Sequence, residues 1–311
     1  MTPLSFDQAL TDYLQVRRAL GYKLKVHGKL LPQFVAYLQE NGARTLTTEH
    51  AVRWATLPPD GPPAWWARRL SVVRGFARYL QNVDPSTEVP PVGVLVHTRQ
   101  RATPYLYSEQ DIAALIMAAG KLDVPFRAMT YQTLIGLLAV TGLRIGEAIG
   151  LDRGDFDSQH GLLTVRHAKF GKSREIPLHP STVEALGVYL RRRDRLQRPE
   201  PTQSALFLSI TGARLPYGNV YATFQELVSQ VGLTPRSAHC RPRLHDFRHS
   251  FAVNTVLEGY RTDGNVQARL LALSTYLGHV DPISSYWYLS AAPELLALAT
   301  GRLERHLGGQ L

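Results

Sequence analysis

Residues 5–82 repeat apolar side chains at helical spacing, a pattern that predicts helices only. Two runs show the pattern most clearly, and the second ends at Asn41-Gly42, a typical helix stop. Their apolar residues are Phe6, Ala9, Leu10, Tyr13 and Leu14, and then Leu30, Leu31, Phe34, Val35 and Leu38. A third helix is expected over residues 48–57, with Thr47 or Thr48 as its cap, and a fourth opens at Pro63. These features predict a small all-α domain over residues 1–84.

The helical pattern stops after residue 82. Prolines and turn-forming residues interrupt it at Asp84-Pro85-Ser86, Pro90-Pro91, Gly93 and Pro104. Such a composition favours an extended, proline-stiffened linker, which we place at residues 85–104. A second domain is then expected over residues 105–311.

The second domain is predicted to be mainly helical with one small β-sheet. Ser108 and Asp111 have capping-box spacing before the first of its helices. Residues 161–178 indicate a β-hairpin with Phe170-Gly171 in its turn. On the first strand Leu163, Val165 and His167 alternate with Thr164 and Arg166, and on the return strand every second residue is Arg174, Ile176 and Leu178. The expected helices cover residues 112–119, 130–140, 181–193, 217–231, 246–258 and 266–276. The predicted fold class is therefore mainly α.

The chain is strongly basic, with a formal net charge of +10. That excess favours a polyanionic partner, although charge alone is equally compatible with a basic protein that has no nucleic-acid role. The first 101 residues hold 13 Lys and Arg against 7 Asp and Glu. One helix carries four of these arginines, near three lysines: Arg68, Arg69, Arg74 and Arg78, with Lys23, Lys25 and Lys29. A single arginine of this kind is more typical of a solvated helix face, but the group predicts a surface that follows DNA phosphates.

Cys240 is the single cysteine, which excludes an intrachain disulfide and a cysteine-rich zinc site. The N-terminal residues lack a basic segment followed by an apolar run, and the longest apolar stretch, near residues 134–140, is too short to span a bilayer. We therefore expect a cytoplasmic protein that acts at the nucleoid and has no membrane partner.

Polar residues suited to one phosphate occur in a fixed order in the second half: Arg144, Lys169, His245, Arg248 and His279. Cleavage of a phosphodiester depends on donors aimed at its non-bridging oxygens, and the planar arginine fork supplies two parallel hydrogen bonds. His245 and Arg248 lie three residues apart, on one face of a helix. Each residue alone is a weak signal, but the combination predicts a phosphate site.

Tyr288 follows His279 by nine residues and is the candidate nucleophile. A phosphotyrosyl ester conserves the energy of the broken bond, so that resealing needs no ATP. The leaving 5′-oxygen needs a proton, which a lysine at the hairpin tip can supply. Lys169 is preferred over Lys172 for this role. Taken alone, the aromatic cluster around Tyr288 would be interpreted as core.

A zinc site is the competing interpretation of His245 and His249, which have the i, i+4 spacing of a zinc-peptidase helix. Asp246 stands where such helices carry Glu, and the positive charge of Arg248 on the same turn opposes a bound Zn²⁺. We therefore expect no metal and no cofactor.

Four segments together resemble the tyrosine recombinase (phage integrase) family in residue type, order and spacing. They are residues 141–147 (TGLRIGE), 244–252 (LHDFRHSFA), 276–279 (YLGH) and 286–289 (YWYL). The resemblance covers residues 105–300, and the first domain resembles the family's core-binding domain more loosely.

The resemblance implies site-specific cleavage and rejoining of double-stranded DNA through a 3′-phosphotyrosine. It implies that Tyr288 is the nucleophile, that Arg144 and Arg248 hold the phosphate, and that Lys169 is the general acid. His245 would assist proton transfer, and His279 would donate to the phosphate. Glu147 would either orient a catalytic group or lie on a solvent-exposed helix face. Lys172 joins the expected DNA contacts.

The resemblance also implies a DNA clamp formed by the two domains and a tetramer on DNA. The C-terminal leucines favour an amphipathic helix that docks either on a neighbouring protomer, as an oligomerisation helix, or on its own domain: Leu295, Leu296, Leu298, Leu303 and Leu307. The amino-acid sequence near the C-terminus looks most like that of recombinases carried by transposons and integrative elements. Two alternatives are a type IB topoisomerase and a catalytically silent DNA-binding protein.

Overall fold

The computed structural model describes residues 5–95, 102–166, 173–196, 204–262 and 265–278, together with the single residues 300 and 304. Within it the chain divides into two compact units, Met1–Arg101 and Ala102–Leu311. Each unit has its own apolar core. The mainly helical fold predicted from the sequence is confirmed.

The first unit consists of four helices in its described part: α1 (Phe6–Ala19), α2 (His27–Glu40), α3 (Thr48–Thr56) and α4 (Pro63–Leu80). The hydroxyl of Ser5 caps α1 and that of Thr47 caps α3, each by accepting a hydrogen bond from a backbone N–H three residues on. Phe34 and Phe76 are fully buried at the centre of the unit. Periodicity and capping together therefore define these helices, because both signals are local in the chain.

Part of the predicted linker packs against the first unit. The backbone N–H of Glu88 donates to the carbonyl of Leu46, and the Glu88 carboxylate accepts from the N–H of Thr48 at 2.7 Å. Val89 and Leu95 pack against the core of the same unit. Residues 85–95 are thus held in place by contacts that the proline pattern did not predict.

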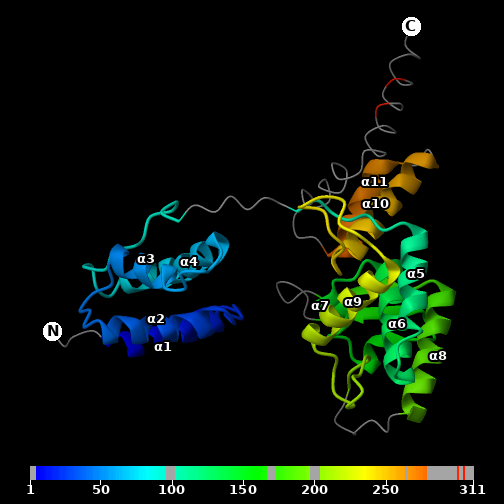
Figure 1. Cartoon of the computed structure of the whole chain (residues 1–311), viewed down its shortest axis with the longest axis horizontal. Helices are drawn as coiled ribbons and strands as arrows, with labels where there is room; N and C mark the ends of the chain where they lie inside the picture. The colour runs from blue at the N-terminus through cyan, green and yellow to red at the C-terminus, as the bar shows by residue number, and fades with distance from the viewer. Residues whose placement is uncertain are drawn as a thin grey trace. The chain divides into compact units, whose positions relative to one another are not determined.

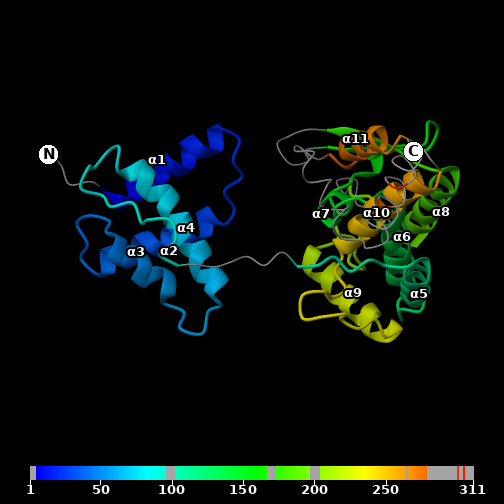
Figure 2. The ribbon, with the colours of Figure 1, turned by 90° about the horizontal axis from the view of Figure 1, so that it is seen from above.

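The second unit surrounds α6 with other helices, and Figures 1 and 2 show α6 among α5, α8 and α10. Its described elements are α5 (Glu109–Ala119), α6 (Pro125–Thr141), α7 (Ile145–Ala148), the 3-10 helix η1 (Arg153–Asp155), β1 (Phe156–Asp157), β2 (Leu162–Val165), β3 (Arg174–Pro177), α8 (Pro180–Leu196), α9 (Tyr217–Val231), α10 (Asp246–Arg261) and α11 (Val266–Leu277). The Ser108–Asp111 capping box forms as predicted at the start of α5. Helix α6 begins five residues earlier than expected, with Pro125 in its first turn.

The sheet is a three-stranded antiparallel meander in the order β1-β2-β3. The hairpin of β2 and β3 was predicted, whereas the two-residue strand β1 was not. Leu163 pairs with Ile176 and Val165 with Arg174. Leu163, Val165 and Ile176 are buried, so that one face of the sheet joins the core, and Arg174 begins β3 on that same face.

Candidate active site

The loop between α6 and α7 places Arg144. Gly142 ends α6 in the left-handed region, with φ of 59°. A Cβ at this position would lie 2.6 Å from Cδ1 of Phe251, so a side chain is excluded by both backbone conformation and space. Leu143 is buried, and Arg144 then takes the N-cap position of α7. The glycine therefore fixes the point from which Arg144 extends.

Glu147 orients Arg144 from one turn further along. Its Oε1 accepts from Nη1 of Arg144 at 2.8 Å, and its Oε2 accepts from the Arg144 backbone N–H at 3.0 Å. The Glu147 side chain is 10% exposed, against 31% for Arg144. Of the two interpretations of Glu147, the structure favours the carboxylate that orients another group over the solvent-exposed one.

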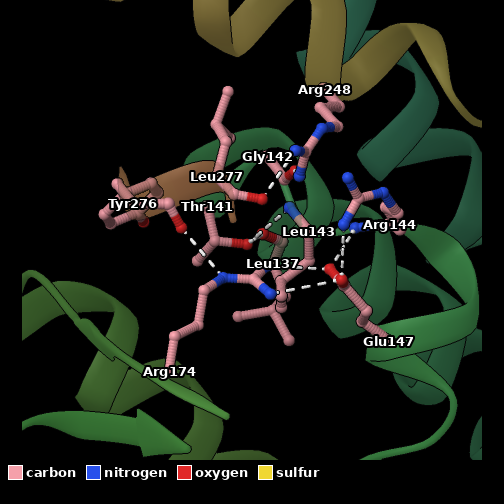
Figure 3. Close-up of polar contacts among 10 residues, drawn as sticks. All are labelled: Leu137, Thr141, Gly142, Leu143, Arg144, Glu147, Arg174, Arg248, Tyr276 and Leu277. Atoms are coloured by element: carbon pink, nitrogen blue, oxygen red, sulfur yellow. Dashed lines mark hydrogen bonds and ion pairs between the residues drawn. The ribbon is translucent and has the colours of Figure 1, made fainter. Parts of the chain in front are cut away.

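Arg174 is a member of this cluster that the sequence did not reveal. Its Nη1 and Nη2 donate to Oε1 and Oε2 of Glu147 at 3.2 and 2.9 Å, and its Nε donates to the carbonyl of Tyr276 at 2.9 Å (Figure 3). A signal was present in the spacing of Arg174, Ile176 and Leu178, which places all three on one face of the strand. A charged residue on the apolar face of a strand needs a buried partner. That signal did not indicate which residue is the partner of Arg174.

The two arginines determine the charge state of Glu147. Burial alone would raise the pKa of this carboxyl, but the hydrogen bonds and charge of Arg174, together with the hydrogen bonds from Arg144, outweigh it and hold the pKa at about 2. Glu147 is therefore ionised at neutral pH and remains a fixed acceptor for both guanidinium groups.

Arg248 joins the end of α6 to the end of α11. It lies in the first turn of α10 and is only 1% exposed. Its Nη1 donates to the carbonyl of Gly142 at 3.0 Å and its Nη2 to that of Leu277 at 2.7 Å (Figure 3). Both carbonyls lie at helix C-termini, where a cation is favoured by the helix dipole. Arg248 thus fixes the backbone on both sides of the site.

His245 lies near both predicted phosphate-binding arginines. Desolvation of its imidazole and the electrostatic effects of His249, Arg248 and Arg144 lower its pKa to about 4, against an opposing effect of Asp246. His245 is therefore neutral at pH 7. A neutral imidazole can accept a proton or donate one hydrogen bond, which suits the predicted role in proton transfer.

Asp246 anchors the start of α10 from the core. Its fully buried carboxylate accepts from Arg243 through Nε at 2.9 Å and Nη2 at 2.8 Å, and its Oδ1 lies 2.9 Å from Nδ1 of His249. His249 thus takes a supporting position beside His245, with ring centroids 4.8 Å apart. Within the described ranges, no three metal-ligating side chains gather in one place.

Residues 107–294 match the phage integrase family. The match covers more than half of the chain. The chain belongs to this family. It is therefore a tyrosine recombinase, a member of an enzyme class that breaks and rejoins DNA strands, and the resemblance noted in the sequence is confirmed.

Curated relatives extend the match to nearly the whole chain. A putative integrase/recombinase, y4rB, of Sinorhizobium fredii is 44% identical over 308 residues, which cover 97% of this chain and 98% of the relative. The tyrosine recombinase XerD of Mycobacterium tuberculosis is 30% identical over 274 residues, covering 81% of this chain and 84% of the relative.

Solved recombinase structures share the fold at low sequence identity. The integrase of transposon Tn1549, in complex with transposon right end DNA, has a TM-score of 0.66 at 16% identity and covers 97% of this chain and 99% of its own. The XerH site-specific recombinase bound to palindromic difH substrate has a TM-score of 0.63 at 19% identity and covers 96% of this chain and 85% of its own.

The remaining predicted catalytic residues are Lys169, His279 and Tyr288, with Lys172 as the alternative lysine. All four lie outside the described residues, as does the C-terminal leucine helix. The described chain leads directly to them. Strand β3 begins two residues after Lys172, and Gly278, which caps the end of α11 with φ of 67°, comes directly before His279. Arg144, His245 and Arg248 are the candidates that the described structure brings together.

The spacing of the four arginines of α4 predicted one shared exposed face, but the structure shows that they do not share one. Arg69 is 7% exposed; its Nη2 donates to the carbonyl of Trp54 at 2.7 Å and its guanidinium stacks on the Trp54 ring. Arg74 donates to the carbonyls of Pro90 and Pro91. Arg68 and Arg78 are exposed. Spacing alone was misleading because Arg69 has an acceptor inside the unit and Arg74 is held by two carbonyls of the chain that follows α4. The expected DNA surface must be redrawn without these two residues.

No helix in the described part of the chain is long and apolar enough to cross a membrane.

Proposed function

We propose that this chain recombines double-stranded DNA site-specifically and that Tyr288 is its nucleophile. The observation that carries the assignment of roles is the convergence of Arg144, Arg248 and His245. Arg144 is oriented by Glu147, Arg248 is fixed by two backbone carbonyls, and both charges act on His245. Preorganised donors of this kind stabilise the charge that develops on a phosphate in its transition state.

The proposed reaction exchanges one ester for another. The Tyr288 oxygen passes its proton to the neutral imidazole of His245 and attacks the scissile phosphorus, forming a 3′-phosphotyrosyl ester as the bond to the 5′-oxygen breaks. Lys169 gives a proton to the leaving 5′-oxygen, while Arg144, Arg248 and His279 bind the non-bridging oxygens and His245 assists proton transfer. Attack by another 5′-hydroxyl reverses these steps and releases the tyrosine.

The wider assembly belongs to the same proposal. Residues 1–84 and 105–311 are the two parts of a DNA clamp joined at 85–104, and Arg68, Arg78 and Lys172 contact DNA phosphates. Four protomers act together on two sites, with the C-terminal helix as the oligomerisation element. A DNA substrate implies action in the cytoplasm, at the nucleoid. Excision or integration of a mobile element is the biological setting that the sequence pattern favours.

Replacement of the nucleophile tests the proposal. The DNA probe is a duplex selected from a library with random cores for binding to the wild-type protein. The position at which the wild-type protein cleaves this duplex is mapped. A nick is then placed beside that position, so that the short cleaved fragment diffuses away and the covalent adduct accumulates. Tyr288→Phe should form no covalent adduct yet bind the probe with nearly wild-type affinity, because only the attacking oxygen is lost. Tyr286→Phe is the matched control and should still form adducts. Adducts with Tyr288→Phe, or their loss with Tyr286→Phe alone, would place the nucleophile elsewhere.

A further inference from the structure

Arg174 lies where three segments of the second unit meet. It belongs to β3, its two Nη atoms donate to Glu147 of α7, and its Nε donates to the carbonyl of Tyr276 in the last turn of α11. We infer that Arg174 is a positioning residue of the recombination reaction, which fixes Glu147 and thereby the guanidinium of Arg144. This inference rests on the proposed function, in which Arg144 binds the scissile phosphate.

The Glu147 carboxylate is shared by two arginines, which differ in how far their side chains are buried and hydrogen-bonded. Its Oε1 accepts from both Arg144 Nη1 and Arg174 Nη1, and its Oε2 accepts from the Arg144 backbone and Arg174 Nη2. The Arg174 side chain is 13% exposed, whereas that of Arg144 is 31% exposed. The more buried arginine has both ends of its guanidinium engaged, so it defines where the carboxylate lies. Arg144 then aligns on a fixed acceptor and keeps an exposed side toward a ligand.

The contacts of Arg174 need an arginine. Three N–H directions reach three acceptors, two carboxylate oxygens on one side and the Tyr276 carbonyl on the other. A lysine ammonium at the end of a flexible stem is a point charge and cannot span them together. Arg174→Lys should therefore keep the charge beside Glu147 but lose its alignment.

Packing at Gly278 adds an independent constraint. A Cβ on Gly278 would lie 3.1 Å from Nη1 and 3.3 Å from Cδ of Arg174, so the end of α11 approaches the Arg174 side chain closely. His279 follows this glycine directly. Three segments thus meet at the Arg174 side chain. They are the strand that follows the Lys169 hairpin, the loop that carries Arg144, and the segment before His279.

The charge of the scissile phosphate provides a specific test. A methylphosphonate replaces one charged non-bridging oxygen with a methyl group, so cleavage of this neutral probe depends less on the Arg144 guanidinium. A misalignment near 1 Å costs about 100-fold in rate. Arg174→Gln should therefore slow adduct formation about 10-fold to 100-fold on the selected phosphate probe. On the same probe with a methylphosphonate at the cleavage position, the loss relative to wild type should shrink to about threefold. An equal loss on both probes would reduce Arg174 to a structural role.

Variants of Glu147 keep the inference testable if Arg174→Gln folds poorly. The double variant Arg174→Gln, Glu147→Gln removes both buried charges together and leaves no carboxylate without a partner. If Arg174 acts through Glu147, the double variant should cleave at about the rate of Glu147→Gln, and this comparison does not need Arg174→Gln alone. A double variant much slower than Glu147→Gln would overturn the inference. Arg174→Lys should fall between Arg174→Gln and wild type in rate.

Arg166 offers a matched control on the same hairpin. It pairs with Asp155 at 2.6 Å and its side chain is 59% exposed. Arg166→Gln should leave adduct formation within about twofold of wild type, because within the described part of the chain its partner Asp155 makes no hydrogen bond or ion pair with Glu147, Arg144 or Arg174. Tyr288→Phe on both probes separates the two claims: persistent adducts would end the proposed function, whereas wild-type rates in Arg174→Gln with no adducts in Tyr288→Phe would end only the inference about Arg174.

Discussion

Arg248 donates through Nη2 to the carbonyl of Leu277 at 2.7 Å, and this bond links the start of α10 to the end of α11. The residue after next is His279. The preceding carbonyl, of Tyr276, is held by Arg174. Two arginines from different elements therefore define where α11 stops, and with it the point from which the chain continues toward the proposed nucleophile.

The burial of Arg248 predicts that its replacement destabilises the second unit as well as slowing cleavage. Arg248→Ala would leave the Gly142 and Leu277 carbonyls without these donors, at about 1–3 kcal/mol for a buried group without its partner. Arg144→Ala removes a more exposed side chain and should change unfolding free energy by less than about 1 kcal/mol while still abolishing adduct formation. Thermal unfolding and adduct yield measure both effects. Equal destabilisation by the two substitutions would contradict the anchoring role of Arg248.

The low pKa of Glu147 predicts an acid-dependent loss of stability. The pKa falls from an ordinary value of 4.5 to about 2 on folding, so between these values the unfolded chain binds a proton that the folded chain does not. The stabilisation that ionised Glu147 contributes is complete at pH values above its pKa in the unfolded chain. It is lost as the pH falls toward its pKa in the folded chain. That shift corresponds to about 3 kcal/mol. Hydrogen exchange of α6 and α10 amides, compared between wild type and Glu147→Gln, should show the wild-type advantage shrinking through this window. A difference that does not vary with pH would rule out the linkage.

His245 should remain neutral until the solution is well below neutral pH. Partial burial and the nearby cations lower its pKa to about 4, so its imidazole signals in an NMR titration should move near that pH. Arg144→Gln removes one of the cations and should raise the pKa of His245. Titration of His245 near 6.5 in the wild type, or no response to Arg144→Gln, would show that these charges do not act on the ring.

The exposed arginines of α4 should contribute to DNA binding, and the buried one should not. Arg68→Gln and Arg78→Gln each remove one expected phosphate contact, which lowers the slope of log affinity against log salt by about 0.9. Arg69→Met should lower the stability of the first unit, because it breaks the contact with Trp54, and should leave the slope unchanged. Affinity for a fixed duplex across a salt series tests all three. Unchanged slopes for Arg68→Gln and Arg78→Gln would remove α4 from the DNA surface.

Much of the local structure was determined by the sequence itself. The periodicity of apolar residues located the helices, and the Ser108–Asp111 pair marked the start of α5, because a cap and its helix are neighbours in the chain. Helix α9 begins and ends where its pattern predicts, at Tyr217 and Val231. The segments that contain Arg144, His245 and Arg248 indicated the family for the same reason, since each motif is a continuous stretch of sequence.

Tertiary structure alone decided which polar groups pair between distant parts of the chain. Glu147 and Arg174 are 27 residues apart, and Arg174 and Tyr276 are 102 apart, so no local spacing relates them. Arg69 has the same helical spacing as its exposed neighbours, yet it lies inside the unit because Trp54 offers it an acceptor and a ring face. A buried guanidinium is stable only where the fold supplies acceptors in the right directions. The sequence contains the charges, but only the assembled core determines where those acceptors point.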